Sequence, residues 1–148
     1  MRRKQLAVVV CGLSVLLAAA AADGRAAFEQ RRDTMKAMGH ALYLGVGRVA
    51  KGRAEFGADT VASAEMLAKL AATIGSLFPP GSDVPDSNMK PAILSAPEQV
   101  AQLAGAVQAA TPGFVVEVKS GDKARIAAAA AAMNKACDAC HNEFRKEE

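Results

Sequence analysis

The sequence predicts an all-α protein that folds as an antiparallel four-helix bundle. The chain is rich in alanine, contains no tryptophan and has few aromatic residues, a composition that favours helices over strands. Apolar residues recur at helical spacing in four segments of similar length, and proline and glycine lie between those segments. Residues 23–148 are long enough for one domain with a single core.

The first two helices are predicted at residues 26–50 and 59–77. The first has apolar residues at every seventh position: Phe28, Met35, Leu42 and Val49. Lys51 and Gly52 should end it. The second carries small and apolar residues at helical spacing, and the Pro-Pro-Gly sequence at 79–81 should stop it.

Residues 79–94 carry four prolines and no helical period, so we expect a long loop there. The third helix should open at Ser95, because Glu98 follows three residues later as in a capping box. Pro112-Gly113 should end it, before a β-branched stretch at 114–118 that looks locally like a strand. The fourth helix should begin at the cap residue Asp122 and run to Arg145.

The chain begins with the features of an export signal. Three basic residues precede an uncharged apolar run at 6–17, and Ala20 and Ala22 offer small side chains for cleavage. A transmembrane anchor would need a longer apolar stretch. We therefore expect cleavage after about residue 22, release of domain 23–148 into the periplasm and no membrane contact of the mature protein.

The predicted signal also accounts for the basic charge of the chain. Removing its three basic residues from the total of 18 leaves 15, against 15 acidic residues, so the mature chain is formally neutral. This balance gives no reason to expect binding to nucleic acid.

The mature chain keeps two cysteines, Cys137 and Cys140, and His141 follows directly. All three lie on one helix face, and Cys-x-x-Cys-His is the attachment signature of a c-type haem. A structural zinc site would need four ligands, but His40 is the only further histidine or cysteine. A redox pair would lie at a helix N-terminus, whereas this motif ends a helix. Two free buried cysteines are the remaining alternative.

The arrangement resembles the cytochrome c′ family, whose haem motif lies in the last helix of a four-helix bundle. The residues that carry the resemblance are Cys137-Asp-Ala-Cys140-His141 with Phe144-Arg145 after it, Arg31 one turn before Met35, and Phe78-Pro-Pro-Gly-Ser. The sequence departs from the family at the Pro112-Gly113 break and in lacking an aromatic residue before the third helix.

The resemblance implies a role for each matching residue. One covalent haem c would be held by Cys137 and Cys140, with His141 as proximal iron ligand. The other implied positions around the haem are Arg31 and Arg32 near the propionates, Asp86 at its border, Met35 over the distal face, Phe78 in the wall and Arg145 near the imidazole. His40 should face outward from the helix that carries Met35.

The function depends on Met35, because a thioether can ligate the iron or simply fill space beside it. The resemblance favours the second case, a five-coordinate haem that binds NO or CO and can also transfer electrons. The alternative is a six-coordinate, low-spin electron carrier that exchanges electrons with periplasmic redox partners. A haem peroxidase would want a distal His or Arg, so we expect no enzyme. The resemblance also implies a homodimer, with Tyr43, Leu44 and Val61 as candidate contacts.

Overall fold

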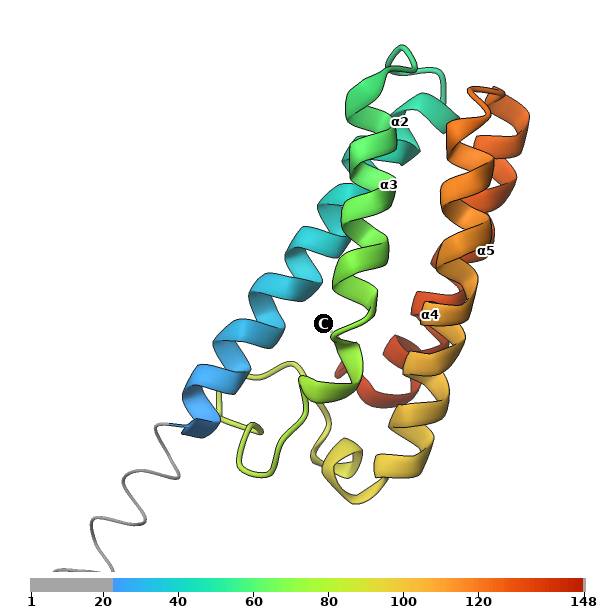
Figure 1. The fold of residues 1–148 in the computed structure, drawn as a ribbon. Helices are drawn as coiled ribbons and strands as arrows, with labels where there is room; N and C mark the ends of the chain where they lie inside the picture. The colour runs from blue at the N-terminus through green and yellow to red at the C-terminus, as the bar shows by residue number, and fades with distance from the viewer. Residues whose placement is uncertain (1–22, 148) are drawn as a thin grey trace, which may run out of the picture.

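The computed structural model describes residues 23–147, so the predicted signal at 1–22 lies outside the described residues. Its helices form the antiparallel four-helix bundle that the sequence predicts (Figure 1). The first helix covers residues 23–39 and continues through η1 (His40–Val46) into α2 (Gly47–Ala50). The others are α3 (Ala58–Ala71), α4 (Pro97–Lys119) and α5 (Lys123–Phe144), with short 3₁₀ turns η2 (Ile74–Ser76) and η3 (Pro91–Ser95).

The seven-residue period suggested a regular α-helix over the whole of 26–50, but part of this helix has another geometry. Its segment η1 is a π-helix, in which the amide of Gly47 donates to the carbonyl of Leu42, five residues earlier. Glycine suits this wider turn, because a Cβ atom at position 47 would lie 3.0 Å from that carbonyl oxygen. The predicted apolar stripe still faces inward: Phe28, Leu42 and Val49 are buried and Met35 is half-buried. Lys51 and Gly52 end the helix as predicted, with Gly52 at a φ of +66°.

The prediction that Pro112-Gly113 ends the third helix is wrong, because α4 continues through both residues to Lys119. Proline has no N–H with which to bond the carbonyl of Gln108 one turn earlier. The hydroxyl of Thr111 donates to that carbonyl instead, at 2.8 Å. Pro112 and Gly113 lie on the exposed side of the helix, while Thr111 and Phe114 are buried. The β-branched stretch that follows is therefore helical.

The structure also changes the predicted end of the second helix, the extent of the loop and the start of the third helix, and it confirms the start of the fourth helix. α3 ends at Ala71 and continues as η2, and the loop at 79–94 contains most of η3. The predicted Ser95 cap is wrong, since Ser95 ends η3 and α4 starts with Pro97 at its first position. Asp122 does cap α5, because its carboxylate accepts a hydrogen bond of 2.9 Å from the amide of Arg125.

The end of the bundle near α2, which we call the closed end, has a fully buried core. Val46, Ala64, Val118 and Ile126 have no exposed surface there. Gly45 lets the first helix come close to α3, since a Cβ atom at that position would lie 2.2 Å from the hydroxyl oxygen of Ser63. Within residues 23–147, no helix is long and apolar enough to cross a membrane.

Candidate haem site

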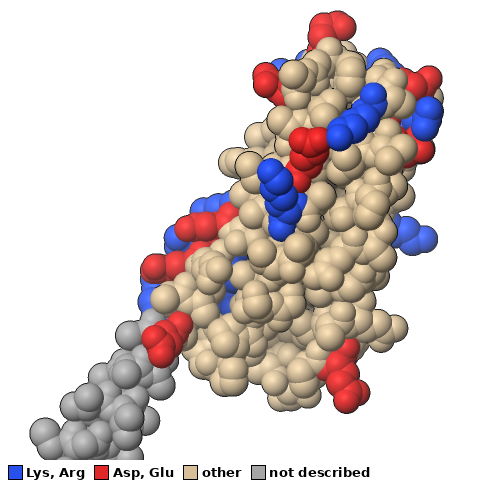
Figure 2. Space-filling model, in the orientation of Figure 1, with Lys and Arg blue, Asp and Glu red and all other residues tan. Residues whose placement is uncertain are grey.

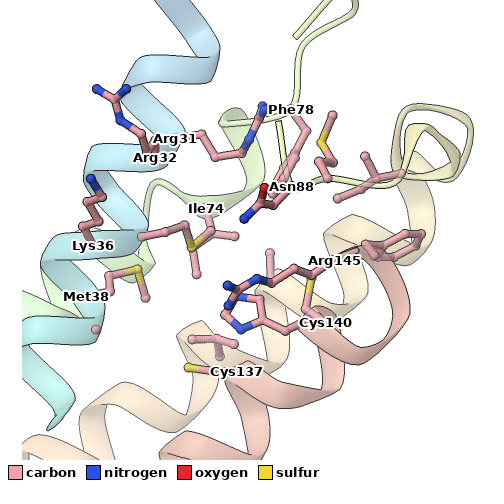
Figure 3. A pocket seen from close by; sticks show the side chains of 18 of the residues that line it. Arg31, Arg32, Lys36, Met38, Ile74, Phe78, Asn88, Cys137, Cys140 and Arg145 are labelled. Carbon is pink, nitrogen blue, oxygen red and sulfur yellow. The ribbon is translucent and has the colours of Figure 1, made fainter. Parts of the chain in front are cut away.

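The other end of the bundle holds a cavity of about 610 Å³, which we call the cavity end. Its walls come from the first helix, α3 with η2, α4, α5 and the loop at 78–90, which leads from Leu77 to η3. Most of its surface is apolar, and its volume falls within the range of about 300–1,000 Å³ that is usual for ligand and cofactor sites. Figure 3 shows the first helix and α5 on opposite sides of this space, with Met38 on one side and Cys137 and Cys140 on the other.

All nine residues that the sequence and the resemblance selected line this one cavity: Arg31, Arg32, Met35, Phe78, Asp86, Cys137, Cys140, His141 and Arg145. They come from the first helix, the loop and the C-terminal part of α5, which are up to about 110 residues apart in the chain. His40, in contrast, is exposed and does not line the cavity, as predicted.

Cys137, Cys140 and His141 share one face of α5 because the helix runs without interruption to Phe144. Both cysteines are free thiols and are half-buried. Burial is the main reason that the pKa of each thiol lies above its ordinary value of 9.0. A redox-active pair would need a lowered pKa, so these thiols do not fit a thioredoxin-like role.

The imidazole of His141 is suited to bind a metal. Burial lowers its pKa below the ordinary value of 6.5, and the nearby charge of Arg145 lowers it further. The ring is therefore neutral at neutral pH and keeps a lone pair on one nitrogen. Arg145 thus lies close enough to act on this imidazole electrostatically, in agreement with the position that the resemblance implied.

Arg31 is buried, with 6% of its surface exposed. One terminal nitrogen donates to the carbonyl of Leu77 at 2.9 Å and to the hydroxyl of Ser82 at 3.0 Å. The other donates to the carbonyl of Ser82 at 2.8 Å and to the hydroxyl of Ser87 at 3.2 Å. These bonds use all four hydrogens of the two terminal nitrogens. The contact between Arg31 and a haem propionate that the resemblance implied could therefore use only the Nε–H group of Arg31 or its positive charge, and it remains a prediction.

The other two charged candidates lie at the surface of the cavity end. Arg32 is exposed and forms an ion pair of 3.0 Å with Asp33. Asp86 is also exposed and pairs with Arg25 of the first helix at 2.7 Å. Both positions border the cavity, as the resemblance implied, but each already has a partner of opposite charge.

Several cavity residues were missed by the sequence analysis as site residues. They are Met38, Tyr43, Ile74, Asn88, Met89, Ile93 and Leu103. The residues of the loop at 78–90 carry no periodic pattern that could have identified them. Met89 nevertheless packs with Phe144 in a small second core beside the cavity.

The same loop is bonded to the end of α5. The amide of Lys90 donates to the carbonyl of Phe144, and the amide of Lys146 donates to the carbonyl of Asn88, both at 2.7 Å. The Lys90 ammonium donates to the carbonyl of Glu143 at 2.9 Å. The last turn of α5, which carries His141, is therefore tied to the loop that lines the cavity.

These observations fit a covalently attached haem. Two free thiols and a neutral imidazole face the same large, mostly apolar cavity, and that donor set matches haem attachment and axial ligation. Among residues 23–147, no group of three or more His, Cys, Asp or Glu residues could hold a metal ion. The donor set thus fits a haem better than a zinc ion.

Comparisons with known proteins agree with this geometry. Residues 26–145 match the family model of cytochrome C′. The chain is 27% identical to the cytochrome c′ of Rhodospirillum rubrum over 146 residues, which cover 98% of this chain and 99% of that protein.

Solved structures of cytochrome c prime from Alcaligenes xylosoxidans share the fold. A ferrous variant with bound NO matches with a TM-score of 0.73 and 25% identity, over 84% of this chain and 97% of that chain. A variant with bound carbon monoxide matches with a TM-score of 0.74 and 26% identity, over the same shares. With the family model covering most of its length and the haem motif in its last helix, this chain belongs to the cytochrome c′ family.

Proposed function

We propose that this protein is a c-type haem protein that binds small diatomic gases, NO or CO, at a five-coordinate iron. The observation that carries the proposal is the cavity, where two free thiols and a neutral imidazole meet apolar walls. Cys137 and Cys140 would hold the haem covalently, and His141 would supply its axial nitrogen. A bound haem supplies an iron that can take a gas ligand and exchange one electron.

The lining of the cavity supports gas binding over peroxidase chemistry. His141 is the only histidine among the described residues that line it. Arg31 lines it too, but its terminal N–H groups are committed to loop oxygens, so they are not free to polarise a bound peroxide. Arg32 is exposed and paired with Asp33. We therefore propose a binding and electron-transfer protein, not an enzyme.

Met35 decides between gas binding and simple electron transfer. Its side chain is half-buried and packs against the main core, which suits a residue that covers a haem face by its bulk. Relatives from Alcaligenes xylosoxidans have been solved with NO and with carbon monoxide bound. The alternative is a six-coordinate electron carrier in which the Met35 sulfur ligates the iron.

An optical spectrum of the reduced protein, with and without CO, separates these two functions. We expect a broad high-spin Soret band and CO binding without prior loss of a protein ligand. Met35→Ala should then bind CO faster and more tightly, because a blocking side chain is removed and no bond is lost. A low-spin wild-type spectrum that Met35→Ala converts to high spin would instead support the electron carrier.

We also propose that the protein is exported and acts in the periplasm, because residues 1–22 have the pattern of a signal peptide. N-terminal sequencing of the purified protein should give a start between about residues 23 and 28. A membrane-bound product that still begins at Met1 would show that the apolar run is an anchor.

A homodimer through the first two helices is proposed on the exposure of their apolar side chains. Tyr43, Leu44 and Met66 are each about half exposed, at 51%, 57% and 51%, and Val61 is partly exposed. Figure 2 shows broad uncharged areas on the face where α3 lies in front. Sedimentation equilibrium of the wild type and of Leu44→Asp should show a dimer that the charge disrupts; a monomeric wild type would contradict this.

A further inference from the structure

The guanidinium of Arg31 joins the first helix to a loop that has little regular structure of its own. One of its four hydrogen bonds ends on the carbonyl of Leu77, just before the loop at 78–90, and the other three end on loop atoms of Ser82 and Ser87. The centre of the Phe78 ring lies 5.4 Å from the guanidinium carbon. None of the ion pairs found in residues 23–147 involves Arg31. This buried cation is therefore held by the loop and not by a carboxylate.

The loop spans the cavity end from one wall to the other. On one side it is bonded to Arg31 and, through Asp86, to Arg25 of the first helix. On the other side Lys90 and Lys146 tie it to the last turn of α5. Five of its residues line the cavity between these two attachments: Phe78, Asp86, Ser87, Asn88 and Met89. Figure 3 shows Arg31, Phe78 and Asn88 grouped on the side of the cavity away from Cys137.

We propose that Arg31 is a positioning residue for the cofactor pocket. The planar guanidinium of Arg31 holds the loop at 78–90 against the first helix. The loop then forms one wall of the cavity, in which Phe78 and Met89 keep water away from the haem. The inference rests on the proposed haem function and adds a residue that acts on the cofactor through the loop. Lysine could not replace it fully, because an ammonium group cannot reproduce the fork geometry.

The neighbouring arginine offers a matched control. Arg31 and Arg32 are adjacent on one helix, both line the cavity, and both place their cation over Phe28, at 5.8 Å and 5.7 Å. Only Arg31 is bonded to the loop. Replacing either one by methionine removes one positive charge near the cavity, but only Arg31→Met removes the clamp.

The first measurement is amide hydrogen exchange of the peptides that cover residues 78–90. The amides of Ser82 and Ser87 close turns within the loop, on the carbonyls of Pro79 and Val84, and the amide of Lys90 donates to the carbonyl of Phe144 in α5. Arg31 holds the two serines of these turns, so losing it should let the turns open more often. We expect Arg31→Met to speed their exchange by roughly tenfold or more, and Arg31→Lys to have a smaller effect. Arg32→Met should leave the exchange of this loop as in the wild type.

The second measurement is the reduction potential of the haem-loaded protein. Opening the wall admits water, which favours the more highly charged ferric state, so the potential should fall in step with loop exchange. The double variant Ser82→Ala/Ser87→Ala removes two of the four acceptors and keeps the Arg31 charge. It should show intermediate exchange and an intermediate potential, and it tests the clamp if Arg31→Met does not fold.

The outcomes separate the clamp from charge and from simple stability. Equal potential shifts in Arg31→Met and Arg32→Met, with unchanged exchange, would overturn the proposal in favour of charge alone. Faster loop exchange with an unchanged potential would also overturn it, since Arg31 would then serve stability only. A wild type without haem would instead overturn the proposed function, while the exchange comparison would still decide whether Arg31 holds the loop.

Discussion

The closed end and the cavity end of the bundle are built in different ways, although the same long helices form both. On α5, Ile126 at the closed end has no exposed surface, whereas Cys137, Cys140 and His141 at the cavity end remain partly exposed. The interior of the closed end is filled by fully buried side chains from the first helix, α3, α4 and α5: Val46, Ala64, Val118 and Ile126. The cavity end leaves about 610 Å³ between them. One end is therefore filled by its own side chains, whereas the other end keeps room for a cofactor.

The largest expected effect comes from removing the attachment points at the cavity end. Cys137→Ala together with Cys140→Ala should give protein that loses its haem on acid–acetone extraction, because no thioether bond can form. The control is Cys11→Ala, which changes the third cysteine, in the predicted export signal, and should leave haem content unchanged. Covalent haem that survives in the double variant would refute attachment through these thiols.

A smaller effect should distinguish the two ends by stability. The comparison uses protein that carries both Cys137→Ala and Cys140→Ala. In it, Ile126→Ala at the closed end should lower the free energy of unfolding by about 2–5 kcal/mol, the usual cost of a large cavity in a packed core. Met35→Ala should cost only about 1 kcal/mol, because its side chain is half-buried beside space that already exists. Urea unfolding measures both, and equal losses would show that the two ends are packed alike.

The smallest effect concerns an ion pair at the closed end. Glu117 accepts hydrogen bonds of 2.6 Å and 3.1 Å from Arg125, which hold its pKa below the ordinary value of 4.5. A lowered folded-state pKa means that this stabilisation is present above pH 4.5 and is lost as pH falls towards the folded-state value. The stability difference between wild type and Glu117→Gln should therefore shrink below pH 4.5. Because both side chains are exposed, the difference should also shrink with added salt.

The sequence and the resemblance predicted which residues meet in the cavity better than the sequence predicted the helix boundaries. Cys137, Cys140 and His141 were found because their spacing in one helix is itself the chemical requirement. The other six predicted site residues came from the resemblance, and all of them line the cavity. The roles given to these residues toward a haem remain predictions.

The wrong helix boundary and the unpredicted partners of Arg31 both depend on particular contacts, which the conformational preferences of single residues do not reveal. Pro112 was expected to break a helix, but Thr111 replaces the missing bond and the proline lies on the exposed side. The bonds of Arg31 to Ser82 and Ser87 join residues about 50 positions apart in an aperiodic loop. No sequence pattern indicates such a contact, so Arg31 could be placed near the cavity but its partners could not be predicted.

The π-helical segment at His40–Val46 affects where the chain can tolerate the deletion of a residue. It lies between the half of the first helix that serves the cavity and the half that serves the closed end. Each residue of an α-helix turns the chain by roughly 100°. A π-turn holds one residue more than an α-turn, so deleting one residue within the segment would relax it to α-geometry and nearly keep the rotation of Arg31 and Met35 relative to Val46 and Val49. A one-residue deletion here should therefore be tolerated better than a one-residue deletion at 36–39, in the regular α-helical part, which would rotate Arg31 and Met35 by roughly 100° relative to Val46 and Val49.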